Sequence, residues 1–186
     1  MASGAWSASY QFRRAPRNFP ADAAAALGTN QVLLPIVPVK LTFLGSAFDT
    51  GALLDTGADF CVLPYEVAEV LNVSPASLGG QPFPMAGVGK DVMVKVTNID
   101  VTVKSRTGNK EIPMLPFLIP VEPQPPGRFV LLGRHPFLSM FDVRFRLGYT
   151  NDPELGKWSL TEVTKHHPSY RYRKGRALAA PARGRR

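Results

Sequence analysis

The chain contains few of the residues on which cross-links and metal sites depend. Of its 186 residues, one is a cysteine and three are histidines. A single cysteine, Cys61, excludes an intramolecular disulfide and favours a reducing compartment. Its apolar surroundings in the sequence predict a buried small side chain rather than a redox switch. No metal site or cofactor is predicted, because neither acids nor cysteines accompany His166 and His167 in the last part of the chain.

Long apolar segments are also absent. The N-terminal sequence MASGAWSASYQFRRAPRNF has no apolar region of the kind that signal peptides contain. No run approaches the roughly 18 apolar residues that a membrane-spanning helix requires. We therefore expect a soluble, cytoplasmic protein, and the 45% hydrophobic content is enough for the core of one domain.

Acidic residues are missing from the C-terminal segment. All 14 Asp and Glu lie before residue 165, where 14 Lys and Arg balance them, so the net charge of +8 belongs to residues 165–186. This segment is rich in Pro, Gly and Ala, and it is predicted to be a disordered tail. Two roles are open for it. It is either a solubilising tail or a segment that binds nucleic acid or an anionic surface. In the second case Tyr170 and Tyr172 would stack among the arginines.

Most of the remaining pattern predicts β-strands. Apolar or alternating residues mark strands at Val32–Phe43, Val92–Val103, Ile112–Val121, Phe141–Leu147 and Lys157–Val163. Leu44–Ala52 is expected to return from the first of these strands as a hairpin. Pro64–Leu71 predicts the clearest helix, and a change of phase near Asn98 predicts a bulge. Residues 1–29 show no convincing pattern and are expected to form an N-terminal extension, before a domain over 30–164 and the tail over 165–186.

Two Asp-Thr-Gly tripeptides, which begin at Asp49 and Asp55, are candidates for a catalytic carboxylate. Asp55 lies between two apolar runs, Ala52–Leu54 and Phe60–Leu63. Asp49 follows the small-residue stretch LGSAF and is interpreted as a residue of a hairpin turn. Because an extended chain would hold the two carboxylates roughly 20 Å apart, Asp49 is not the partner of Asp55. For either tripeptide taken alone, an ordinary Asx turn is the alternative.

A second segment supports Asp55. LLGRHPFLSMFDVRF, from Leu131 to Phe145, has two apolar residues, Gly133, Arg134 and a short helical stretch before an alternating strand. Together with DTGADFCVLPYEVAEVLNV, which begins at Asp55, it resembles the motifs of retropepsin-like aspartic proteases, in particular the cellular and bacterial members. The resemblance implies a closed, mostly β acid-protease fold with one or two short helices, one after the active site and another after Gly133.

The resemblance also implies roles for the residues that follow Asp55. Asp55 would be the catalytic carboxylate, and Thr56 would hydrogen-bond across a two-fold axis. Gly57 would allow the backbone to turn and would place its N–H beside the carboxylate. Ala58 is small, as the family pattern requires, and Phe60 would line a substrate subsite.

Three further groups match the family by position. Asp59 and Arg134 would form an ion pair that supports the active-site loop, although an incidental exposed pair is the alternative. The C-terminal motif consists of Leu131, Leu132 and Gly133. The tip of a mobile flap would consist of Gly87, Val88 and Gly89, for which an ordinary Gly-rich hairpin is the alternative.

One chain supplies one Asp55, whereas aspartic peptidase chemistry needs two carboxylates that share a proton. A two-fold homodimer is therefore predicted. The expected activity is that of an aspartic endopeptidase, in which a water is activated between the Asp55 carboxylates of two subunits and cleaves a peptide or protein substrate. Two alternatives remain: a non-catalytic dimeric binding module of the same fold, and a nucleic-acid-associated protein that acts through residues 165–186.

Overall fold

The structure is a computed structural model, and it describes residues 5–16, 20–27, 31–86, 91–125, 127–145 and 156–163. The predicted flap tip at residues 87–89 and the basic tail at residues 165–186, with its histidines and tyrosines, lie outside these ranges. The roles assigned to them remain predictions.

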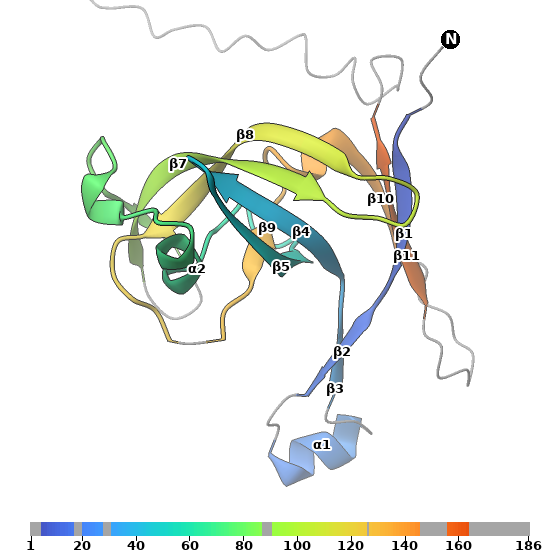
Figure 1. Ribbon diagram of the computed structural model, residues 1–186. Coiled ribbons are helices and arrows are strands. Elements are labelled where there is room, and N and C mark those ends of the chain that lie inside the picture. The colour runs from blue at the N-terminus through green and yellow to red at the C-terminus, as the bar shows by residue number, and fades with distance from the viewer. Residues whose placement is uncertain are drawn as a thin grey trace, which may run out of the picture.

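A six-stranded sheet forms the body of the protein (Figure 1). Its strands are β4 (Ile36–Phe43), β5 (Ser46–Leu54), β6 (Phe83–Met85), β7 (Val92–Val103), β8 (Lys110–Pro120) and β9 (Val130–Leu132). The order is β6-β7-β4-β5-β9, and β8 pairs with β7. Only β5 and β9 pair in parallel among these strands.

Alternating apolar residues explain why the strands of the body pack on one core. In β4, Val37, Val39 and Leu41 are fully buried, and the residues between them are more exposed. This period of two is that of a strand with one face on the core. The predicted bulge is present as a shift of register between Ile99 and Val101, where β7 pairs with β8.

The N-terminal residues, for which the sequence shows no convincing pattern, contribute a strand. Ser7–Gln11 form strand β1. This strand pairs with β11 (Lys157–Glu162), which in turn pairs with β10 (Phe141–Phe145), so the two ends of the described chain share a three-stranded sheet. Buried Ala8 and the stacking of Tyr10 on Trp158, with ring centroids 4.5 Å apart, attach β1 to the body.

A second difference concerns the expected strand Val32–Phe43, which is divided in two at Pro35. The first part is strand β3 (Gln31–Leu34), which pairs with β2 (Arg13–Pro16) in a separate two-stranded ribbon. Between them in the sequence lies helix α1 (Ala21–Leu27), which was not predicted. Figure 1 shows this ribbon and helix projecting away from the body.

The expected short helices are present. Helix α2 (Tyr65–Val70) follows the Asp55 segment and buries Ala68, and the 3₁₀ turn η1 (Pro75–Ser77) comes after it. A second 3₁₀ turn, η2 (Leu138–Met140), follows Gly133. The mostly β fold with short helices is therefore confirmed. None of the helices in the described ranges is long and apolar enough to cross a membrane.

Candidate active site

Asp55 lies directly after β5, on a loop that is closed by its own hydrogen bonds. Leu54 is buried, whereas Asp55 is partly exposed. The Gly57 N–H donates to Oδ1 of Asp55 at 2.8 Å, and the Ala58 N–H donates to the Asp55 carbonyl oxygen at 3.3 Å. The first bond orients the carboxylate. A Cβ atom on Gly57 would lie 3.1 Å from the same Oδ1, so a larger residue there would disturb this arrangement.

Strand β9 holds the chain on both sides of the Asp55 loop. On one side β9 pairs with β5, and the Asp55 N–H donates to the Leu132 carbonyl oxygen at 3.2 Å. On the other side Leu131 exchanges two backbone hydrogen bonds with Val62, of 2.9 and 3.0 Å. The chain therefore enters and leaves the loop along the same strand. This double attachment gives a carboxylate on a loop a defined position.

The motif residue Gly133 comes directly after β9 and touches the Asp55 loop. A Cβ atom at Gly133 would lie 2.2 Å from the carbonyl oxygen of Phe60 and 2.5 Å from its carbonyl carbon. Both atoms belong to the backbone, so no side-chain rotation could relieve the overlap. The close approach of two backbones explains why this position requires glycine.

Gly133→Ala should therefore destabilise the protein, because the Asp55 loop must move away from β9 to make room for the methyl group. We expect the free energy of unfolding, measured by chemical denaturation, to decrease by about 1–3 kcal/mol. Gly79→Ala is the matched control, since a Cβ atom there would meet nothing within 4 Å. Equal stability of the two variants would contradict the close approach.

The predicted partners Asp59 and Arg134 do form an ion pair, from Nη2 of Arg134 to Oδ1 of Asp59. Their side chains are 70% and 59% exposed, so this pair contributes only about 0–1 kcal/mol. Backbone bonds attach the same segments: the Arg134 N–H donates to Ala58 and the His135 N–H to Asp59, both at 2.8 Å. His135 was not identified from the sequence. It contributes a backbone hydrogen bond to Asp59, and no residue pattern in the sequence predicts such a bond.

Two apolar side chains of the loop differ in exposure. Phe60 is half exposed, and its ring is nearly perpendicular to that of His135, with the ring centroids 6.5 Å apart. Cys61 is fully buried, as predicted, and burial raises the pKa of its thiol to about 11, against an opposing effect of hydrogen bonds from the Gly133 and Phe137 backbone. The thiol is therefore neutral and inaccessible at physiological pH, which agrees with a packing role.

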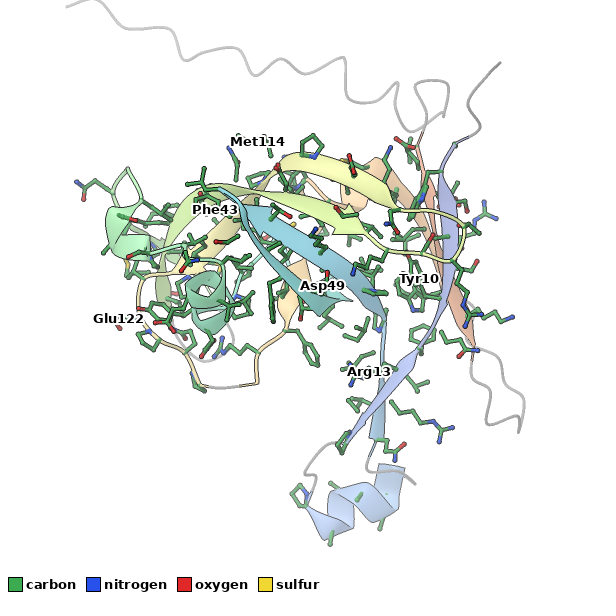
Figure 2. The ribbon with its side chains drawn as sticks, viewed as in Figure 1. Tyr10, Arg13, Phe43, Asp49, Met114 and Glu122 are labelled. Atoms are coloured by element: carbon green, nitrogen blue, oxygen red, sulfur yellow. The ribbon has the colours of Figure 1, made fainter. Side chains whose placement is uncertain are left out.

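Asp49 is not a turn residue, contrary to the interpretation of the sequence. It lies inside β5 (Figure 2), opposite Lys40 of β4. Its carboxylate pairs with Lys104 at 2.8 Å. The turn of this hairpin is at Leu44 and Gly45, which both have positive φ. Asp49 is therefore a strand residue with a basic partner.

The remaining predicted residues lie near this loop or outside the described ranges. Thr56 is exposed, and within the described chain its hydroxyl has no hydrogen-bond partner, so it is accessible to a second molecule.

Gly87, Val88 and Gly89 belong to the connection between β6 and β7 and are not described. The two flanking strands pair antiparallel, from Phe83 opposite Val94 to Met85 opposite Val92.

Comparisons with known proteins give similarities in fold only. No family model matches the chain, and no curated protein matches it. A solved retropepsin-like aspartic protease from Rickettsia conorii is 15% identical over 85% of this chain and 96% of its own, with a TM-score of 0.44. EIAV protease in complex with the inhibitor HBY-793 is 24% identical over 54% of this chain and 82% of its own, with a TM-score of 0.34.

Proposed function

We propose that this protein is an aspartic endopeptidase whose active site is formed by the Asp55 loops of two subunits. The observation that carries the proposal is the geometry of the loop. A partly exposed carboxylate accepts the Gly57 N–H, and the chain on either side of it is attached to β9. The backbone thus orients the carboxylate, which remains accessible to solvent on a segment with a defined position. A general base that activates a water requires both properties.

In this proposal the second carboxylate comes from another chain. Within one chain, Asp49 has Lys104 as its partner and lies six residues from Asp55 along an extended strand. A two-fold axis next to the loop would bring together two copies of Asp55, with Thr56 exposed beside each. Since two carboxylates about 3 Å apart do not both ionise, the pair retains one proton and contains an acid and a base.

The reaction then needs only this pair and a water. The ionised carboxylate takes a proton from the water, whose oxygen attacks the carbonyl carbon of the peptide. The protonated carboxylate gives its proton to the carbonyl oxygen, and a tetrahedral diol forms. The carboxyl group that took the proton from water then gives it to the nitrogen, and the other carboxylate takes a proton from one hydroxyl of the diol. The C–N bond breaks, a carboxylic acid and an amine are released, and the pair again holds one proton. No bond forms between the protein and its substrate, so no acyl-enzyme is expected.

The direct test is incubation of the purified protein with a diverse peptide library, with mass spectrometry to identify the cleaved bonds. Pepstatin, which mimics the tetrahedral state, should suppress cleavage, because transition-state analogues bind more tightly than substrates. Asp55→Asn protein from the same purification serves as the control for contaminating proteases. Cleavage that persists equally in the control would exclude the proposed site.

The activity should depend on pH in a bell-shaped manner, with its maximum on the acidic side of neutrality. At low pH both carboxylates carry protons and no base remains, and at high pH both are ionised and no acid remains. The measurement is kcat/KM between about pH 3 and pH 9, with circular dichroism at each pH to confirm that the protein stays folded. A constant kcat/KM across this range would contradict the shared proton.

A further inference from the structure

Among the residues that the structure describes, no further layer covers the ribbon of β2 and β3. These two strands pair with each other and with no other described strand. Between Ala8 and Val37, none of the residues that the structure describes is buried. An isolated two-stranded ribbon is at best marginally stable in water, because it has no apolar face covered by another layer. A stable ribbon at this position therefore requires contact beyond the residues that the structure describes.

The register shows what each face of the ribbon offers. Residues opposite each other across two strands point to the same side of a sheet. One side carries Leu34 and the opposed pair Ala15 and Val32, all partly exposed. The other side carries Arg14 opposite Leu33, and Leu33 is 37% exposed. Apolar side chains thus remain accessible on both sides.

The base of the ribbon lies beside the candidate active site. Pro35, which joins the ribbon to β4, accepts a hydrogen bond from the Leu54 N–H at 3.0 Å, and Leu54 directly precedes Asp55. The next residue, Ile36, is opposite Leu53. The ribbon therefore leaves the body at the end of the sheet where Asp55 lies. Figure 2 shows Arg13 on the ribbon, outside the body.

We propose that this ribbon is an arm that packs on the partner subunit of the homodimer. The inference rests on the proposed function in one respect, since that function brings the Asp55 loop of a second chain to this end of the sheet. A partner at that place is adjacent to the base of the arm. By two-fold symmetry each subunit would give one arm and receive one, so each contact is formed twice. The arm would then link formation of the active site to burial of its own apolar residues.

Removal of the arm tests the proposal. In the antiparallel register Arg13 is opposite Leu34, so their Cα atoms are within about 5.5 Å and a Gly-Gly link between Phe12 and Pro35 can replace residues 13–34. Because no described residue of this segment is buried, the body should stay folded by circular dichroism. We expect the dimer dissociation constant, measured by sedimentation equilibrium, to increase by at least about tenfold.

A point substitution tests the same contact with less disturbance. Leu33→Glu places a charge on the arm and should also weaken the dimer by about tenfold. Leu44→Glu is the matched control: Leu44 is 91% exposed and lies at the turn of the β4–β5 hairpin, at the opposite end from Ile36. That substitution should leave the dissociation constant unchanged.

Hydrogen exchange on the unmodified chain provides a readout without any variant. Amides of Val32–Leu34 should be protected above the dimer dissociation constant and should lose protection on dilution below it. Dimerisation that is equally tight with and without the arm, or ribbon protection that is independent of concentration, would overturn the inference. A wild-type chain that stays monomeric would overturn it too. Sedimentation and exchange do not depend on cleavage, so absence of peptidase activity in a dimer that needs the arm would refute the proposed function alone.

Discussion

Asp55→Asn should remove peptide cleavage and leave the fold and the dimer intact. Asparagine is nearly isosteric with aspartate, and its side-chain oxygen can still accept the Gly57 N–H that closes the loop at 2.8 Å in the wild type. It cannot take a proton from water, so the general base is lost. Removal of such a group costs about 10²–10⁴-fold in rate. We expect kcat/KM to fall by at least that much, with circular dichroism and sedimentation unchanged.

Asp49→Asn is the matched control, because it makes the same chemical change in the other Asp-Thr-Gly tripeptide. Asp49 pairs with Lys104, and the two side chains are 63% and 38% exposed. Loss of an exposed pair of this kind costs about 0–1 kcal/mol, and the variant should keep most of its activity. Equal inactivation of both variants, or full activity of Asp55→Asn, would remove Asp55 from the mechanism.

Local sequence features were sufficient to predict the backbone around Asp55, at the centre of the candidate site. The apolar run before Asp55, the glycine after Thr56 and the helix that follows are each encoded by neighbouring residues, and the structure has a strand, a tight loop and α2 in this order. Cys61 is buried for the same reason, since it lies in an apolar stretch. Such features depend on propensity and periodicity, which a single sequence contains.

Features that depend on distant contacts were missed. The Asp49 tripeptide has residues typical of turns, yet the hairpin turns at Leu44, a leucine with a φ of 45° that turn preferences disfavour. The segment SASYQ of β1 is too short and polar to be recognised, and its partner β11 lies at the other end of the chain. The approach of Gly133 to Phe60 is likewise a tertiary contact. Helix α1, in contrast, had a local signal in its run of alanines, the residue with the highest helix propensity.

Mixed dimers of wild-type and Asp55→Asn chains test whether the active site is shared. If each subunit contributes one Asp55, a mixed dimer contains a single catalytic carboxylate and should be essentially inactive. With random exchange, the fraction of fully wild-type dimers is the square of the fraction of wild-type chains. An equal mixture, at fixed total protein well above the dimer dissociation constant, should therefore retain roughly a quarter of the wild-type activity.

A complete site within each chain gives a different result, namely roughly half of the wild-type activity and a linear dependence on the wild-type fraction. Unexchanged homodimers would also give the linear result, so exchange must first reach equilibrium, as shown by native mass spectrometry of chains with different tags. Asp49→Asn chains mixed with wild type in the same way are the control, and their activity should hardly change with composition. A linear decline after complete exchange would show that Asp55 of one chain acts without Asp55 of another. The two-fold axis beside the loop would then lose its chemical basis.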